Sequence, residues 1–136
     1  MILIVCGSRS FDDPEFLFRK MDSLTRKLNK KKLTIVTGAQ RSKAKDGHSH
    51  GADYFAEQWA RKNWCNMLRF HADWQKHGKA AGMIRNTEML KESEATVLIA
   101  FRVNGPSPGT DDSVAKARKK GLRVIVVKCK AKGNGK

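Results

Sequence analysis

Short apolar runs alternate with longer amphipathic segments along the chain. Runs of strand length, rich in β-branched and other apolar residues, occupy residues 2–6, 33–37, 65–70, 95–101 and 122–128. Between them, apolar residues recur at helical spacing in residues 14–29, 52–62, 81–92 and 111–120. Asp13 before Pro14 marks the first helix start, and Gly121 is a C-cap residue after the last helix. The inward faces of the first three helices are expected to carry Phe16, Met21, Leu24 and Leu28, then Phe55, Ala56 and Trp59, then Ile84, Met89 and Leu90.

This order predicts an α/β protein with a Rossmann-like, doubly wound, mainly parallel five-stranded sheet and helices on both faces. With 136 residues the chain is too short for two independent cores. We expect one domain over residues 1–128 and a basic flexible tail over residues 129–136. Ligands of such sheets bind beyond the carboxyl ends of the strands, which directs attention to the loops at 7–14, 38–51, 71–80 and 102–109.

The charge balance is strongly basic. There are 28 Lys and Arg residues against 13 Asp and Glu, a formal net charge of +15. Such an excess favours phosphate-bearing partners, either small nucleotides or nucleic acid, although solubility alone also explains it.

Several classes of protein and site are disfavoured. No apolar run approaches the roughly 20 residues of a membrane helix, so no membrane partner is expected. Met1 leads directly into a strand pattern rather than a signal peptide. Cys6, Cys65 and Cys129 are odd in number and far apart, which favours free thiols in a reducing, cytoplasmic setting. His48 and His50 form no closed ligand set, so neither a metal nor another cofactor is expected.

The first two loops carry small residues and one cation. Gly7, Ser8 and Arg9 directly follow the first strand, where a backbone amide, a hydroxyl and a guanidinium can meet an anion. An ordinary tight turn is the alternative. Gly38 follows the second strand, and Asp53 begins the next helix, either holding a ribose hydroxyl or complementing the helix N-terminus.

The third loop and the helix after it have the highest density of candidate residues. Lys76, Lys79 and Arg85 surround a glycine-rich turn that opens a helix, a favourable setting for a phosphate. Asn86 can donate to a sugar or base. Trp74 either stacks on a base or plugs the sheet edge.

The fourth loop ends in Gly109 and Thr110, which offer amide and hydroxyl donors to a phosphate. Asp111 and Asp112 follow; they suit a helix N-terminus, and general-base roles are a minor alternative. Residues 40–50 are polar and long for a strand-to-helix connection, and we expect a mobile loop there.

Read in order, these motifs resemble a known family. They are Gly7-Ser8-Arg9, Thr37-Gly38-Ala39, Gly51-Ala52-Asp53, Ala72-Asp73-Trp74, Gly78-Lys79-Ala80-Ala81-Gly82 and Ile84-Arg85-Asn86, with Gly109-Thr110 last. Together they are similar to the YspA-like branch (domain of unknown function 2493) of the SLOG superfamily, over residues up to about Lys128. That superfamily includes the DNA-processing Smf/DprA proteins and the lonely-guy cytokinin-activating enzymes.

The resemblance implies a Rossmann-like fold, a nucleotide-derived ligand at the carboxyl edge and a homo-oligomer, dimer or tetramer. The lonely-guy enzymes cleave an N-glycosidic bond with an Arg and a Glu. Arg85 matches the position of that Arg, but Ser113 occupies the position of the Glu. A serine does not replace a carboxylate in that chemistry unless Asp111, Asp112 or Asp53 substitutes, so whether the protein is an enzyme stays open. The stretch 41–50 is also an insertion relative to the family pattern.

Three functions therefore compete. The first is binding or sensing of a nucleotide-derived small molecule, such as an NAD- or ADP-ribose-like compound or a nucleoside phosphate. The second is a nucleotide N-glycosidase or phosphoribohydrolase of the lonely-guy type. The third is binding of single-stranded nucleic acid, as in the DNA-processing relatives; the basic charge supports it, and an aromatic content of 7% weakens it.

Overall fold

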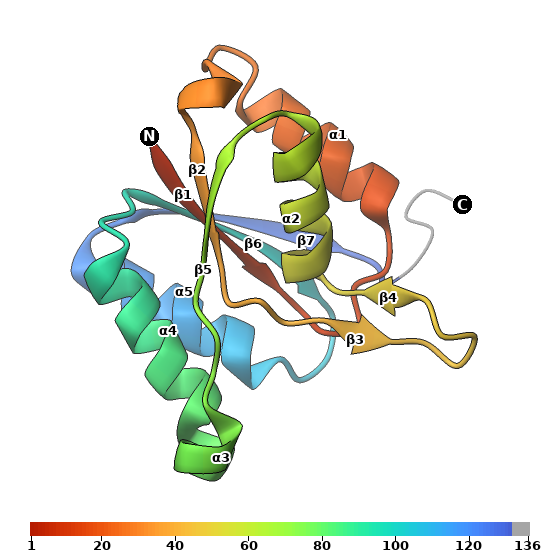
Figure 1. Ribbon diagram of the computed structural model, residues 1–136, viewed down its shortest axis with the longest axis vertical. Coiled ribbons are helices and arrows are strands. Elements are labelled where there is room, and N and C mark those ends of the chain that lie inside the picture. The colour runs from red at the N-terminus through yellow and green to blue at the C-terminus, as the bar shows by residue number, and fades with distance from the viewer. Residues whose placement is uncertain (132–136) are drawn as a thin grey trace.

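A five-stranded parallel sheet forms the centre of the protein in the computed structural model, which describes residues 1–131 (Figure 1). The strands are β1 (Ile2–Gly7), β2 (Thr34–Thr37), β5 (Asn66–Arg69), β6 (Val97–Val103) and β7 (Arg123–Cys129). They lie in the order β5-β2-β1-β6-β7, and every neighbouring pair is parallel. The predicted α/β, Rossmann-like class is confirmed.

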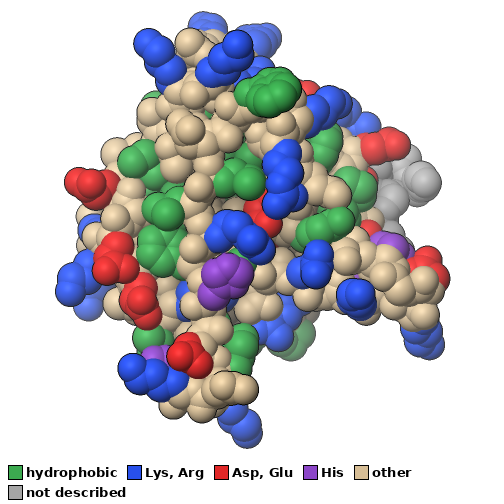
Figure 2. Space-filling view, viewed as in Figure 1, with side chains coloured by type: hydrophobic (Ala, Val, Ile, Leu, Met, Phe, Trp, Pro, Cys, Tyr) green, Lys and Arg blue, Asp and Glu red, His purple; other side chains and the backbone are tan. Residues whose placement is uncertain are grey.

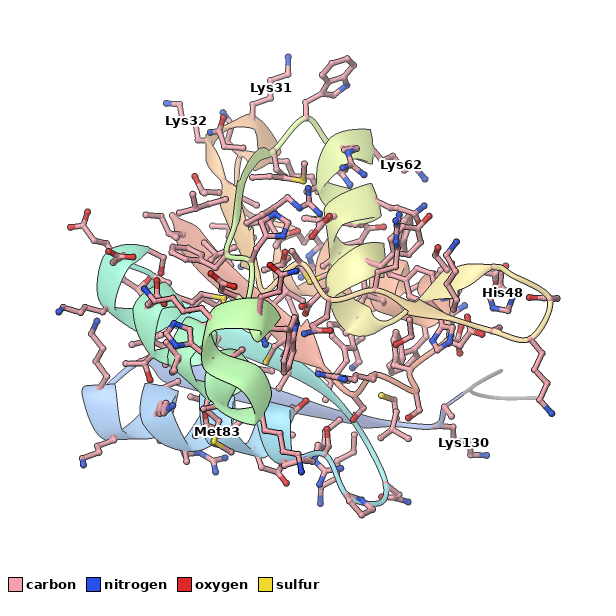
Figure 3. All side chains as sticks on the ribbon, turned by 60° about the horizontal axis from the view of Figure 1, so that its bottom comes forward. Lys31, Lys32, His48, Lys62, Met83 and Lys130 are labelled. Atoms are coloured by element: carbon pink, nitrogen blue, oxygen red, sulfur yellow. The ribbon has the colours of Figure 1, made fainter. Side chains whose placement is uncertain are left out.

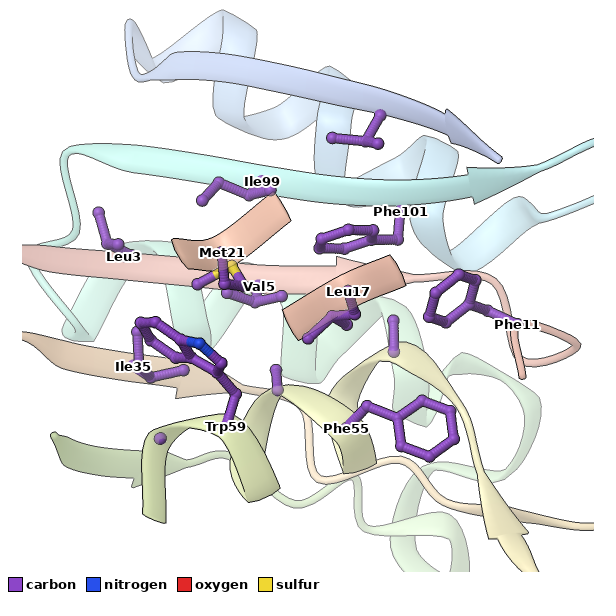
Figure 4. Close-up of a cluster of buried hydrophobic side chains, with 14 of the residues drawn as sticks. Leu3, Val5, Phe11, Leu17, Met21, Ile35, Phe55, Trp59, Ile99 and Phe101 are labelled. Carbon is purple, nitrogen blue, oxygen red and sulfur yellow. The ribbon is translucent and has the colours of Figure 1, made fainter. Parts of the chain in front are cut away.

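Helices cover both faces of the sheet. α1 (Pro14–Leu24) and α2 (Ala52–Lys62) lie on one face, and α4 (Ala81–Glu92) and α5 (Pro108–Lys120) lie on the other (Figure 1). Alternate residues of β1 point to opposite faces, as the pleat of a strand requires. Val5 therefore packs with Leu17 and Trp59 (Figure 4), whereas its neighbour Ile4 belongs to the cluster under α4 and α5. Because both faces are covered, the central strands are apolar throughout.

The strand order places a topological switch point beside β1. From β1 the chain moves outward to β2 and β5 and then returns to the other side of β1 for β6 and β7. Gly7 ends β1 at this point, opposite Phe101 of β6. A Cβ atom on Gly7 would lie 2.5 Å from both Ala52 Cβ and the Phe101 carbonyl oxygen, so only glycine fits. Loops from both halves of the sheet meet at this edge.

The first helix is shorter than predicted. α1 ends at Leu24, not near residue 29, because both the amide and the hydroxyl of Thr25 donate to the Met21 carbonyl and cap the last turn. A 3₁₀ turn, η1 (Lys30–Lys32), then leads into β2. The prediction that Leu24 faces the core is wrong; the side chain is 38% exposed at the helix end.

Three stretches that the sequence pattern assigned to loops contain helical or strand residues. α5 begins at Pro108, three residues before the predicted start, because Pro suits the first helical position. The third loop folds into α3 (Trp74–His77) and η2 (Gly78–Ala80). Instead of a structureless loop, residues 40–50 contain an antiparallel hairpin of β3 (Ser42–Lys43) and β4 (Ser49–His50).

The C-terminal strand runs one residue beyond its predicted end, to Cys129, which is buried. Ala131 still contacts the body of the protein, because its carbonyl accepts from the Asp12 amide at 2.6 Å. The rest of the predicted tail, 132–136, lies outside the described residues. Within residues 1–131, no helix combines the length and apolarity needed to cross a membrane.

Candidate functional site

A hollow of about 600 Å³ opens at the carboxyl edge of the sheet, beside the switch point. Its walls come from the loops after β1, β2 and β6, from α3, η2 and α4, and from the start of α5. The predicted site residues that line it are Gly7, Ser8, Arg9, Gly38, Asp53, Trp74, Lys79, Arg85, Asn86, Gly109 and Thr110. Segments up to about a hundred residues apart in the chain thus meet in one concave surface, as expected of this fold.

Lys76 is the predicted site residue that the structure leaves outside the hollow. It belongs to α3, where its amide donates to the capping Asp73 side chain at 3.1 Å. Gly78, with a φ of 56°, ends this short helix before Lys79. The two lysines therefore sit on different elements, and only Lys79 borders the hollow.

Arg85 lies at the floor and is 8% exposed. Its Nη1 donates to the Gly38 carbonyl at 2.7 Å and its Nε donates to Asn86 Oδ1 at 3.0 Å. Asn86 Nδ2 in turn donates to the Gly109 carbonyl at 3.2 Å. The pair thereby joins the loop after β2 to the first turn of α5. A Cβ on Gly38 would lie 2.8 Å from the guanidinium carbon, so a side chain there would displace the Arg85 guanidinium from this position.

Arg9 and Trp74 form the outer rim. The guanidinium carbon of Arg9 lies 5.7 Å from the centre of the Trp74 ring, a cation–π distance. Trp74 is 46% exposed, so it does not plug the sheet edge, and much of its ring is accessible beside the hollow. Arg9 and Lys79 are both exposed. The rim therefore presents two hydrated cations and one aromatic face, whereas the floor holds a buried guanidinium.

Asp53 is the carboxylate in the wall of the hollow, and it is 6% exposed. Its Oδ2 accepts from the Gln40 amide at 3.0 Å, which fixes the loop after β2. Burial raises the pKa of Asp53 to about 6, although the Gln40 hydrogen bond and the Arg85 charge oppose that rise. Burial also raises the pKa of the Cys6 thiol beside it. Burial therefore favours the neutral thiol of Cys6 over the thiolate.

A chain of hydroxyls joins the loop after β1 to the start of α5 at the edge of the hollow. Ser8 Oγ accepts from the Val103 amide at 3.0 Å and donates to Ser107 Oγ at 3.1 Å. Ser107 Oγ donates to Thr110 Oγ1 at 3.0 Å. The sequence analysis did not single out Ser107 or Gln40. Ser107 has a recognisable signal, because it immediately precedes Pro108 at a helix start.

The acidic residues at the start of α5 point to other partners. Asp111 pairs with Arg102 at 2.8 Å, and this hydrogen bond lowers the pKa of Asp111. Asp112 pairs with Lys116 at 2.8 Å and also accepts from Asn86. Neither residue lines the hollow, whereas the buried Ser113 does. Of the three carboxylates considered as replacements for the missing Glu, only Asp53 is in place.

His48 lies on the hairpin and outside the hollow (Figure 3). Its ring nitrogens contact Asp12 at 2.7 Å and Asp46 at 2.5 Å. Within residues 1–131 no group of three or more His, Cys, Asp or Glu side chains is arranged to hold a metal ion.

Comparisons with known proteins agree with this architecture. The family model described as "YspA, cpYpsA-related SLOG family" matches residues 1–77, which includes the first two loops and Trp74 but ends before Lys79 and Arg85. The chain is 34% identical over 128 residues to "Gene 61 protein" of Mycobacterium phage D29, covering 90% of this chain and 93% of that protein. No solved structure matches. Membership of this family suggests a nucleotide-related function. The chain belongs to the YspA, cpYpsA-related SLOG family.

Proposed function

We propose that this protein binds a nucleotide-derived small molecule in the hollow at the carboxyl edge of the sheet. One observation carries the proposal: Arg9, Lys79 and Arg85, from three separate segments, border the same cavity together with an accessible aromatic ring. The cavity of about 600 Å³ lies within the range of small-molecule sites. An NAD- or ADP-ribose-like compound or a nucleoside phosphate combines the anionic, polar and aromatic groups that suit such a surface.

The phosphate fits best between Arg9 and the first turn of α5. Gly109 and Thr110 occupy that turn, where backbone amides lack helical acceptors and the helix dipole favours an anion. Adding a Cβ to Gly109 would meet nothing within 4 Å, so its backbone is open to a ligand. Lys79 contributes a further positive charge at the rim.

The sugar and base then extend toward Asp53 and Trp74. Asp53 offers an acceptor near the floor, suited to a ribose hydroxyl, whereas both amide protons of Asn86 are already donated to Gly109 and Asp112. Arg85 uses Nε and Nη1 within the protein, which leaves Nη2 to donate to the ligand. The Trp74 face suits base stacking.

A thermal-shift titration with AMP, ADP-ribose and NAD tests the proposal. At a ligand concentration of about 100 times Kd, a single site stabilises the folded protein by about 2.7 kcal/mol. Lys79→Ala should weaken binding of the preferred ligand by about 5- to 20-fold, because it removes one charge-assisted contact.

Lys76→Ala is the matched control. It removes the same charge from an exposed lysine three residues away that does not line the hollow, so the affinity should stay within about twofold. The proposal fails if none of the three ligands shifts the melting temperature, or if both variants weaken binding equally. Mass spectrometry of molecules released on denaturation provides an independent identification.

Hydrolysis of an N-glycosidic bond is the second candidate, favoured by Asp53. This carboxylate lines the hollow, and its pKa of about 6 suits proton transfer near neutral pH. Incubating the protein with nucleoside monophosphates and NAD, followed by chromatography, measures base release. Release by the wild type and loss in Asp53→Asn supports an enzyme; no release at high protein concentration leaves binding alone.

A reducing, cytoplasmic location and a homo-oligomer form part of the same proposal. Cys6, Cys65 and Cys129 are all free thiols, as is usual in that compartment. The dimer or tetramer rests on the family resemblance, and sedimentation measures it.

A further inference from the structure

Trp64 is the most exposed large apolar side chain of the described residues, at 78%. It follows α2 in the left-handed backbone region, with a φ of 59°. The Trp64 amide donates to the Arg61 carbonyl and the Cys65 amide to that of Ala60, which is the hydrogen-bond pattern of a Schellman cap. Glycine or asparagine normally occupies that position, because other side chains are strained there. The fold gives no packing reason for an indole here.

Five cations lie in η1 and at the end of α2, the elements nearest this indole; one of them, Lys62, has its Nζ 5.6 Å from the centre of the Phe18 ring. Lys30, Lys31 and Lys32 form η1, and Arg61 and Lys62 end α2. Within residues 1–131, none of these five side chains forms an ion pair. No Asp or Glu occurs in residues 23–45 or 58–72. These two segments therefore carry cations and contribute no carboxylate.

Strand register brings the two segments together. β2 and β5 are parallel neighbours with Thr34 opposite Asn66, so Lys32 and Trp64 each stand two residues before a paired position. The Asn66 amide donates to the Leu33 carbonyl at 2.9 Å. Burial raises the pKa of the Cys65 thiol, and the positive charge of Lys30 opposes that rise. Lys31, Lys32 and Lys62 lie at the same end of the molecule in Figure 3, and Figure 2 shows cations around a large apolar side chain there.

We propose that this surface, the Trp64 patch (Trp64, Lys30, Lys31, Lys32, Arg61 and Lys62), binds single-stranded nucleic acid. It lies at the amino edge of the sheet, away from the hollow that contains Met83 (Figure 3). An exposed indole stacks on an unpaired base without regard to its identity, and flanking cations neutralise the phosphates on either side. Positive charge with an aromatic platform is the combination that single strands require.

Two other partners fit less well. Insertion into an anionic membrane needs a broad apolar face, whereas the chain neighbours of Trp64 include the cationic Arg61 and Lys62 and the polar Asn63 and Asn66. A duplex keeps its bases stacked and gives the indole nothing to contact. The exposed ring and the cations of η1 and α2 favour a single strand.

Fluorescence anisotropy with a labelled oligothymidine of about 15 nucleotides tests the proposal. The full chain should bind it at about 50 mM salt, with an affinity that falls steeply as salt rises. Trp64→Asn should weaken binding by about 5- to 100-fold, because one stacking contact is lost, while asparagine tolerates the left-handed backbone. Trp64→Phe should retain most of the affinity.

Charge variants separate this patch from general electrostatics. Lys31→Ala with Lys32→Ala should reduce the slope of log affinity against log salt by about 1.4, since each phosphate contact contributes about 0.7 on a single strand. Lys43→Ala with Lys45→Ala removes the same charge from the hairpin and should leave affinity within about twofold. Lys79→Ala should also leave oligonucleotide binding unchanged, which keeps this test independent of the hollow.

The proposal is overturned if the oligonucleotide does not bind at about 50 mM salt, or if Trp64→Asn and the Lys31/Lys32 variant both bind like the wild type. Equal losses in the Lys43/Lys45 control would reduce the effect to net charge and overturn it too. Trp64-dependent binding to phosphatidylserine vesicles without oligonucleotide binding would assign the patch to a membrane instead. If circular dichroism shows that Trp64→Asn does not fold, the Lys31/Lys32 variant tests the proposal instead, because an unchanged affinity and salt slope in that variant would overturn it.

Discussion

At the scale of single residues, Asp53 fixes the loop after β2 at the hollow but lowers the free energy of unfolding. Its carboxylate accepts from the Gln40 amide and lies in the field of Arg85, yet burial outweighs both effects and raises its pKa to about 6. An acid whose pKa is raised on folding binds its proton more tightly in the folded state. Ionised Asp53 therefore opposes folding at neutral pH.

Asp53→Asn should stabilise the protein at pH 8. The folded pKa of about 6 against an ordinary 3.8 corresponds to a penalty of about 1–3 kcal/mol, absent below pH 4 and complete above pH 7. Asparagine keeps an oxygen for the Gln40 amide. Urea unfolding at pH 4, 6 and 8 should show a gain that grows with pH. A variant that is less stable than the wild type at pH 8 would show that attraction between ionised Asp53 and Arg85 stabilises the folded protein more than burial of the carboxylate destabilises it.

At the scale of elements, the short hairpin of β3 and β4 is linked to the body by His48, besides the Gly51 amide that donates to Phe11 and Arg41 that lies over Tyr54. Each strand has two residues, too short to be stable alone. His48 links the hairpin to the body, because one ring nitrogen contacts Asp46 and the other contacts Asp12 beyond β1. A doubly protonated ring donates at both nitrogens. The hydrogen bonds to Asp12 and Asp46 accordingly raise the pKa of His48.

The link should weaken as pH rises. A raised histidine pKa means that the stabilisation is fully present below pH 6.5 and is lost as pH passes through the folded value. NMR titration of the His48 ring should give a pKa above 6.5, and Asp12→Asn should lower it. Asp111→Asn, which changes a carboxylate paired with Arg102 in another loop, serves as the control and should leave the His48 titration unchanged. An unaltered titration in Asp12→Asn would mean that the contact does not form in solution.

The whole molecule carries its positive charge at both edges of the sheet. Arg9, Lys79 and Arg85 line the hollow at the carboxyl edge, and the Trp64 patch occupies the amino edge. With a formal net charge of +15, mutual repulsion among cations opposes the compact state. Screening by salt should relieve this repulsion.

Raising sodium chloride from about 10 to 150 mM shortens the screening length from about 30 to 8 Å and should raise the melting temperature by about 2–5 °C. Sodium phosphate at equal ionic strength should raise it further, because the hollow offers specific anion contacts as well as screening. Scanning fluorimetry at matched ionic strengths measures both effects. Identical shifts of the melting temperature in the two salts would argue against a phosphate-binding site at Gly109 and Arg9.

Much of the fold and of the hollow could be predicted from the sequence because the signals are local. β-branched runs define the strands, and parallel strands bring their carboxyl ends to one edge, so the segments that follow β1, β2, β5 and β6 meet there. That geometric consequence placed Arg9, Lys79 and Arg85 together. The position of Lys76 could not be inferred, because spacing alone does not show that Gly78 ends α3.

Other features have no local signal. Two-residue strands show no periodicity, so the hairpin of β3 and β4 was missed. Leu28 keeps helical spacing beyond α1, whereas Thr25 ends the helix through a hydrogen bond that the pattern does not reveal. The left-handed Trp64 contradicts residue preference, and its exposure became evident only in the structure.

The hydrogen-bonded pair Arg85 and Asn86 also has a consequence for the energetics of recognition. Their bonds to the Gly38 and Gly109 carbonyls tie the loop after β2 to the first turn of α5 before any ligand arrives. Conformational entropy that would otherwise be lost on association has already been lost during folding. A preorganised cradle of this kind devotes more of its contact energy to affinity, and it discriminates against molecules that would require the loops to rearrange.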